Sequence, residues 1–170
     1  DSGKPYWHSF DENGTAHYYS HNKISASLAA EAFSRLKSDK KTAETVCTLV
    51  MHHDAPLPDS EKLIKRRLRQ FGEENFFRLI EVHKADTAAL NPEFTKGRAE
   101  ELETIRLKTQ EILLHRQCFC LKDLAVNGND VQSAGYSGRE IGEALEKLLS
   151  AVTDGRLPNE RGALIDYIKR

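Results

Sequence analysis

Apolar residues recur every three to four positions along most of this chain, and short segments rich in proline, glycine or asparagine interrupt the pattern. Such spacing puts the apolar side chains on one face of a helix, whereas a half-buried strand requires alternation. Breaks occur at Pro56 and Pro58, at Gly72, and at Asn91 with Pro92, because proline lacks the amide hydrogen that a helix interior needs. The pattern predicts an all-α protein. The expected helices cover about residues 22–37, 43–55, 60–71, 73–90, 92–116 and 137–153, with a short helix after 158 and a short strand at 15–19.

The segment 92–116 predicts a long helix with few apolar positions, among them Leu102 and Ile112. A strongly polar helix of this length often bridges two bodies, with one face packed and the rest in water. We therefore expect three parts: a helical body at 1–91, a connecting helix at 92–116 and a small helical tail at 117–170.

The composition excludes several classes of protein. No apolar run approaches the roughly 20 residues that span a bilayer. Three cysteines, Cys47, Cys118 and Cys120, are an odd number without framework spacing and fit reduced thiols in a cytoplasm. The formal net charge of −1 gives no overall attraction to nucleic acid, so any such binding must depend on local patches.

Histidines gather at the expected helix ends. His21 begins the first helix and His52 with His53 end the second, whereas His83 lies one turn before Asp86 on the fourth. Helical proteins hold divalent metal ions with imidazole and carboxylate groups that converge on a bundle interior. A bound metal can generate a hydroxide for phosphoester hydrolysis. Surface histidines or hydrogen-bonded core histidines produce the same spacing, so both interpretations stay open at this point.

Four short segments of the chain occur in the order of known family motifs. Residues 1–5 resemble the end of a His-Asp-x-Gly-Lys-Pro segment, and residues 20–26 resemble a Gly-His-Glu-x-x-Ser-Ala segment. Residues 51–54 resemble the next histidine segment and residues 85–86 the final aspartate. In this order they resemble the HD-type body of bacterial CCA-adding tRNA nucleotidyltransferases and related poly(A) polymerase-like enzymes. The tail is also similar to that family, through "CFCLKDLAVNGNDV" and "GREIGEALEKLLSAVTDGRLPNER".

The resemblance implies that residues 1–91 form an HD-like helical body, followed by the connecting helix and the helical tail. The metal ligands implied for this body are Asp1, His21, His53 and Asp86. The histidine that precedes the aspartate in the family segment is not in the chain, so we expect an incomplete site for a divalent metal. Ser20 and Asn22 also replace the usual glycine and glutamate of their segment.

In this family a nucleotidyltransferase head precedes the body, and its Gly-Ser segment and paired carboxylates bind two Mg²⁺ ions for nucleotidyl transfer. The sequence contains no Gly-Ser dipeptide and no Asp-x-Asp pair. We therefore expect a C-terminal fragment without catalytic residues of its own. Its expected function is to hold the acceptor and T arms of tRNA for a cytoplasmic enzyme that matures and repairs tRNA 3′ ends.

The segment "EKLIKRRLRQ", at residues 61–70, is the strongest local concentration of positive charge in a nearly neutral chain. Helical geometry is expected to turn Leu63 and Leu68 toward the core. Lysine and arginine supply most of the affinity for RNA phosphates. The residues predicted to contact these phosphates are Lys62, Lys65, Arg66 and Arg69. A solvated helix face is the alternative.

Two other functions fit parts of the pattern. A metal-dependent HD phosphohydrolase that acts on nucleotides or cyclic phosphates would use the histidines, but it needs the His-Asp doublet whole. A purely architectural helical module would use its surface for self-association. The aromatic residues Tyr6, Trp7, Tyr18 and Tyr19 could stack on RNA bases, but a chain of this size needs aromatic residues for its core, and we expect them there.

Overall fold

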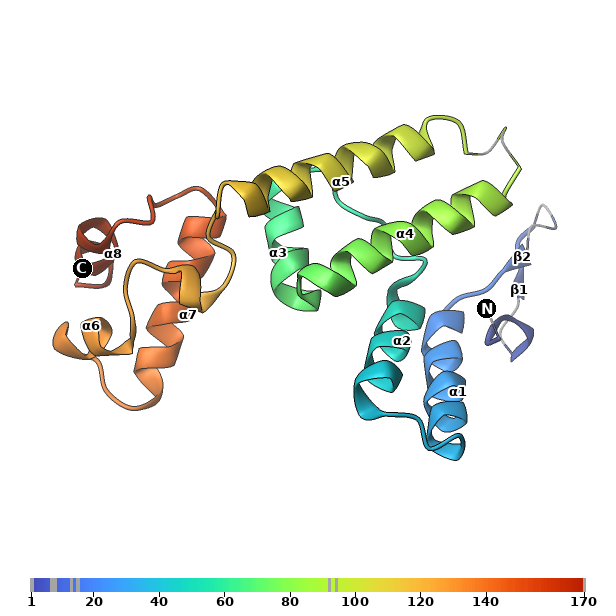
Figure 1. Ribbon diagram of the computed structural model, residues 1–170, viewed down its shortest axis with the longest axis horizontal. Helices are drawn as coiled ribbons and strands as arrows, with labels where there is room; N and C mark the ends of the chain where they lie inside the picture. Colours follow the sequence, from blue (N-terminus) through green and yellow to red (C-terminus); the bar gives the residue numbers. More distant parts are fainter. Residues whose placement is uncertain are drawn as a thin grey trace. The chain divides into compact units, whose positions relative to one another are not determined.

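The computed structural model describes residues 2–6, 9–12, 14, 16–91, 93 and 95–169, and Figure 1 shows the order of its elements. The regular secondary structure of this part of the chain is helical apart from one antiparallel pair of two-residue strands, in which Ser9 pairs with His17 and Phe10 with Ala16. The prediction of an all-α protein is confirmed. None of the helices described is long and apolar enough to cross a membrane.

The long helices lie in the predicted segments, but α5 begins six residues later than predicted and the short helix α6 was not predicted. In chain order they are η1 (Lys4–Tyr6), β1 (Ser9–Phe10), β2 (Ala16–His17), α1 (His21–Arg35), α2 (Lys40–His52), α3 (Glu61–Phe71), α4 (Glu73–Ala89), α5 (Arg98–Leu114), η2 (Leu121–Asp123), α6 (Gly128–Ser133), α7 (Arg139–Thr153) and α8 (Arg161–Ile168).

The chain divides into two compact units. Unit 1 comprises Asp1–Leu57 and Glu74–Leu102, and unit 2 comprises Pro58–Glu73 and Glu103–Arg170. In this division α3 groups with the C-terminal segment and the change of unit falls inside α5. The body, connecting helix and tail stay a prediction.

In unit 1, α1 and α2 lie side by side and run in opposite directions (Figure 1). The carboxylate of Asp39 accepts a 2.9 Å hydrogen bond from the amide of Thr42, which satisfies one free N–H in the first turn of α2. At the far end of α2, the side-chain amide of Asn22 donates a 2.9 Å hydrogen bond to the carbonyl of Met51. The start of α1 and the end of α2 are therefore tied together.

Gly3 lies against the first turn of α1. Its amide donates a 2.9 Å hydrogen bond to Ser25 Oγ, and a Cβ atom at this position would lie 2.3 Å from the carbonyl oxygen of His21. That neighbour is a backbone atom held by its helix, so only glycine fits without a shift. Ser20, which stands where the family segment has glycine, has a φ of 62°. This left-handed conformation costs a residue with a side chain about 1–2 kcal/mol.

The N-terminal tyrosines lie on the surface, so the prediction that they fill the core is wrong. Tyr6 and Tyr19 are about two-thirds exposed and Tyr18 is more than one-third exposed, whereas Trp7 lies outside the described residues. Tyr19 is instead stacked on His17, with ring centroids 5.4 Å apart. The buried apolar side chains among the described residues of unit 1 are Ala26, Phe76, Leu79, Ile80 and Leu102.

The core of unit 2 forms around α7. Leu148 and Leu149 of α7 are fully buried, together with Val131 of α6 and Leu164 of α8. Burying each leucine side chain contributes about 1.5–3 kcal/mol to folding. This cluster therefore fixes α7, and α7 in turn packs against α3.

The rotation of α3 differs by about one residue from the predicted one. Ile64 and Leu68 are fully buried, whereas Leu63 is 43% exposed. Residues four apart lie on one face of a helix, but Leu63 and Leu68 are five apart and diverge. The predicted core position is therefore confirmed for Leu68 and wrong for Leu63.

The three cysteines are free thiols. Burial raises the pKa of Cys118 to about 11. Burial also raises the pKa of Cys120, whose thiol donates a 2.8 Å hydrogen bond to the Asp123 carboxylate. Both thiols are therefore protonated at neutral pH. The protonated form of a thiol is a poor nucleophile and a poor metal ligand.

Candidate functional site

The candidate RNA-binding surface is the outer side of α3. We call its four cations, Lys62, Lys65, Arg66 and Arg69, the α3 stripe. The burial of Ile64 and Leu68 fixes the rotation of the helix, and Gly72 ends it with a φ of 76° that suits glycine. The side chains of Lys62, Arg66 and Arg69 are 47%, 51% and 41% exposed. Lys65 is mostly covered and forms an ion pair with Glu61 at 2.8 Å.

Three cations of the α3 stripe form ion pairs with carboxylates at α7. Asp154 Oδ1 lies 3.2 Å from Lys62 Nζ and 2.9 Å from Arg66 Nη2. Arg69 pairs with Glu146. The structure thus brings all four predicted residues to one surface, and each already has a carboxylate partner within unit 2.

Asp154 is the most enclosed of these carboxylates, with 11% of its side chain exposed, and it caps the C-terminus of α7. Burial acts to raise the pKa of this carboxyl group. A hydrogen bond from Lys62 and the charge of Arg66 outweigh that effect, so the pKa of Asp154 lies below its ordinary value of 3.8. The carboxylate is therefore ionised at neutral pH and bridges the two cations.

This bridge predicts a pH-dependent stability. A carboxylate whose pKa is lowered by folding stabilises the folded state above its ordinary pKa, and this contribution is lost as the pH falls through the lowered value. We expect Asp154→Asn to lower the denaturant midpoint of unfolding at neutral pH, and the difference from the unmodified chain to shrink as the pH falls below the ordinary value of 3.8 and through the lowered pKa. A difference that stayed constant down to the lowest pH would contradict the role of the charge.

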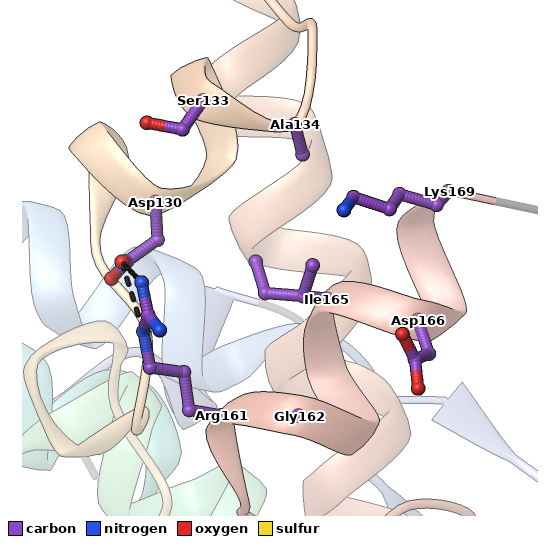
Figure 2. Close-up of a pocket in the computed structure, with 8 residues that line it drawn as sticks. All are labelled: Asp130, Ser133, Ala134, Arg161, Gly162, Ile165, Asp166 and Lys169. Atoms are coloured by element: carbon purple, nitrogen blue, oxygen red, sulfur yellow. Dashed lines mark hydrogen bonds and ion pairs between the residues drawn. The ribbon is translucent and has the colours of Figure 1, made fainter.

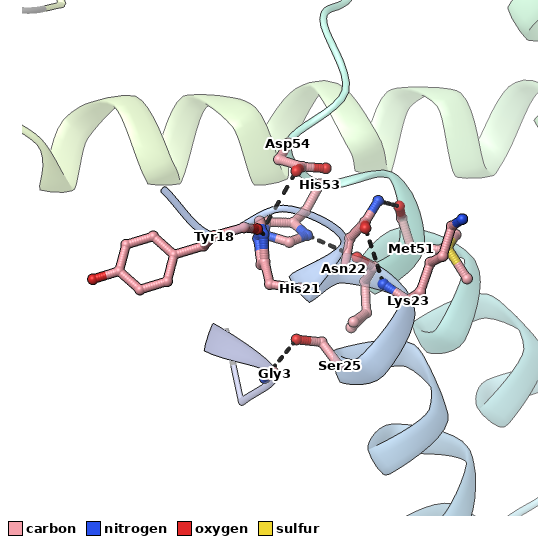
Figure 3. Close-up of polar contacts among 10 residues, drawn as sticks. Gly3, Tyr18, His21, Asn22, Lys23, Ser25, Met51, His53 and Asp54 are labelled. Carbon is pink, nitrogen blue, oxygen red and sulfur yellow. Dashed lines mark hydrogen bonds and ion pairs between the residues drawn. The ribbon is translucent and has the colours of Figure 1, made fainter. Parts of the chain in front are cut away.

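A second candidate site in unit 1 is a pair of histidines, drawn in Figure 3. His21 is the first residue of α1 and its Nδ1 lies 2.7 Å from the carbonyl oxygen of Tyr18. His53 follows α2 and its Nδ1 lies 2.7 Å from the carbonyl oxygen of Val50. A carbonyl only accepts hydrogen bonds, so both Nδ1 atoms carry a proton.

These tautomers point two lone pairs at each other. The Nε2 atoms of His21 and His53 are 3.3 Å apart, and a carboxylate oxygen of Asp54 lies 3.8 Å from Nε2 of His21. With both rings neutral, each Nε2 offers only an acceptor. Two acceptors at this distance suit a shared cation.

Among the residues that the structure describes, too few possible metal ligands lie together to form a metal site. Within the described part of the chain, no group of three or more histidine, cysteine, aspartate or glutamate residues is placed to hold a metal ion. His21 and His53 come together, Asp86 lies on α4 one turn after His83, and Asp1 lies outside the described residues. The predicted set of four ligands therefore stays a prediction, and we derive no chemical step through a metal.

His83 belongs to the same neighbourhood and was not among the predicted ligands. It is buried, and its Nε2 is without a hydrogen-bond partner among the residues described. Burial lowers the pKa of His83, the charge of Arg98 adds to this, and the carboxylates of Asp86 and Asp54 oppose it. Its position one turn before Asp86 places it among the histidines that the sequence suggested for a metal site, although the resemblance does not imply it as a ligand.

A hollow in unit 2 lies between α6 and α8 (Figure 2). Arg161 donates two hydrogen bonds to one oxygen of Asp130, from Nε at 3.1 Å and from Nη2 at 2.6 Å. Asp166 and Lys169 also line the hollow. Two acids and two bases balance there, so the lining has no preference for an anion, and the Arg161–Asp130 pair joins α6 to α8.

Two comparisons with known proteins show what the chain is similar to. Residues 15–168 match the family model described as tRNA nucleotidyltransferase domain 2, putative. The chain is 27% identical over 168 residues to a CC-adding tRNA nucleotidyltransferase of Thermus thermophilus. The match covers 96% of this chain and 36% of that protein, so the chain spans little more than a third of the relative's length. No solved structure matches the chain.

Proposed function

This chain belongs to the tRNA nucleotidyltransferase domain 2 family, and we propose that it is the tRNA-binding body and tail of an enzyme that adds nucleotides to tRNA 3′ ends in the cytoplasm. The observation that carries this proposal is the match of nearly the whole chain to about a third of a CC-adding enzyme. The rest of such an enzyme would supply the head that binds Mg²⁺ and transfers nucleotides.

In this proposal the α3 stripe contacts phosphates of the acceptor and T arms of tRNA. Its support is geometric, since Lys62, Arg66 and Arg69 lie half-exposed on one face of a helix that a buried core holds in place. A-form RNA is recognised largely through its phosphates and shape, and a row of cations along a helix suits that recognition.

The histidine pair supports the alternative function, a phosphohydrolase of the HD type. Two imidazole lone pairs from His21 and His53 converge, and we retain Asp1 and Asp86 as the further ligands proposed for a divalent metal. Self-association of the chain also stays a prediction. The tRNA-binding function is supported by a match across residues 15–168, whereas the alternative depends on this one contact.

The division of labour predicts that the 170-residue chain alone does not add CTP or ATP to tRNA that lacks its 3′ CCA. The measurement is incorporation of labelled nucleotide in the presence of Mg²⁺, with a complete CCA-adding enzyme as the positive control in the same buffer. Clear incorporation by the chain alone would refute the proposal that the chemistry lies on other residues.

A further inference from the structure

The α3 stripe is held by acids of its own unit before any RNA arrives. Asp154 binds both Lys62 and Arg66, and Glu146 binds Arg69. These three cations remain between 41% and 51% exposed, so a phosphate can still reach them. A phosphate that approaches the stripe therefore meets donors that already serve a carboxylate.

Asp154 occupies a position that the helix itself disfavours. It caps the C-terminus of α7, where unpaired carbonyl groups and the negative end of the helix dipole repel a carboxylate. Three cations offset this repulsion, because Arg156 Nη2 also lies 3.4 Å from Asp154 Oδ2, beside the contacts from Lys62 and Arg66. The charge of Asp154 is stabilised by these cations, and in turn it lowers the positive electrostatic potential of the α3 stripe.

A carboxylate and a phosphate compete for the same charge and the same N–H groups. Arginine has five donors and lysine three, so a cation can serve both partners, but each negative neighbour weakens the attraction of the next. We infer that the carboxylates of Asp154 and Glu146 compete with RNA phosphates for the cations of the α3 stripe. Their presence therefore weakens the binding of RNA by the stripe. This inference rests on the proposed tRNA-binding function.

The competition predicts an unusual pair of effects. Removing either carboxylate charge leaves the donors of the stripe free for phosphate, so affinity for tRNA rises. Removing Asp154 also removes the bridge between α3 and the end of α7, so stability falls. Damage to the fold alone would lower both quantities.

The experiment compares three isosteric variants of the full chain, Asp154→Asn, Glu146→Gln and Glu143→Gln. Glu143 is the matched control, because it lies on α7 one turn before Glu146 and pairs with Arg139 of its own helix at 2.9 Å. All three variants remove one negative charge. The dissociation constant for tRNA that lacks its 3′ CCA is measured at about 0.1 M salt, where charges more than about 10 Å apart are screened.

We expect Asp154→Asn and Glu146→Gln each to bind tRNA about two- to five-fold more tightly, the range that loss of one surface ion pair allows. Glu143→Gln is expected to bind like the unmodified chain. Equal tightening by all three variants would overturn the inference, since it would show a general charge effect. Unchanged binding by Glu146→Gln would overturn it as well, since an ion pair as exposed as this one contributes little to stability. If the unmodified chain bound no tRNA at low salt, the proposed function would fail and the inference with it.

Discussion

Reversing two charges of the α3 stripe, Arg66→Glu with Arg69→Glu, is expected to weaken binding of tRNA by the chain about 10- to 100-fold at low salt. Each of the two substitutions removes one charge-assisted contact with an RNA phosphate, worth about 1 kcal/mol or more of binding free energy. The slope of log affinity against log salt is expected to become shallower by about 2, because about one counterion is released for each phosphate contact. The measurement is fluorescence anisotropy of labelled tRNA over a series of salt concentrations.

The reversal needs a control, because Arg66 and Arg69 also bind Asp154 and Glu146. The double variant Arg78→Glu with Arg106→Glu makes the same change of net charge. It also breaks two ion pairs, with Glu74 on α4 and Glu103 on α5, but leaves α3 unchanged. We expect this control to bind tRNA several-fold better than the α3 variant. Equal weakening by both would contradict a contact at α3.

Replacing Phe76 by alanine is expected to lower the free energy of unfolding by about 3–5 kcal/mol, the usual cost of a buried phenylalanine. Phe76 is fully buried on α4, the helix that also carries His83. The neighbouring residue provides a matched control, because Phe77 is only partly buried. The measurement is urea unfolding of Phe76→Ala and Phe77→Ala. Equal losses would contradict the orientation of α4.

The sequence predicts the helices well, because their apolar residues recur with a helical period and their ends carry recognisable breakers. α5 illustrates both the success and its limit. Leu102 and Ile112, two of the few apolar positions of the expected helix, are buried. Its start was placed at 92, but the helix begins at Arg98, directly after Gly97 with a φ of 80°. A glycine with positive φ marks the start of this helix, but the spacing of apolar residues does not show where such a glycine interrupts the chain.

The orientation of α3 was within reach of the sequence. Ile64 and Leu68 are spaced as one helical face requires, and choosing them in place of Leu63 and Leu68 would have given the observed rotation. The carboxylates that pair with the α3 stripe could not be predicted from the sequence. Arg66 meets a carboxylate 88 positions away, and only the tertiary packing of α3 on α7 brings the two together.

The histidines show the same boundary between local and tertiary information. Their positions at helix ends suggested that His21 and His53 converge, and the Nε2 atoms do lie 3.3 Å apart. The tautomers depend on carbonyl groups of Tyr18 and Val50, whose directions follow from the backbone and not from residue identity. The exposed N-terminal tyrosines were misplaced for a related reason, because a hydrophobicity pattern does not show which surface a neighbouring segment covers.

The proposed function requires this chain to bind tRNA through the phosphates of the RNA. Its most direct test is the affinity of the unmodified 170-residue chain for tRNA lacking the 3′ CCA, measured from about 50 mM to about 200 mM salt. We expect clear binding at the lowest salt, with log affinity falling linearly against log salt. Undetectable binding at the lowest salt, or affinity that does not change with salt, would contradict it.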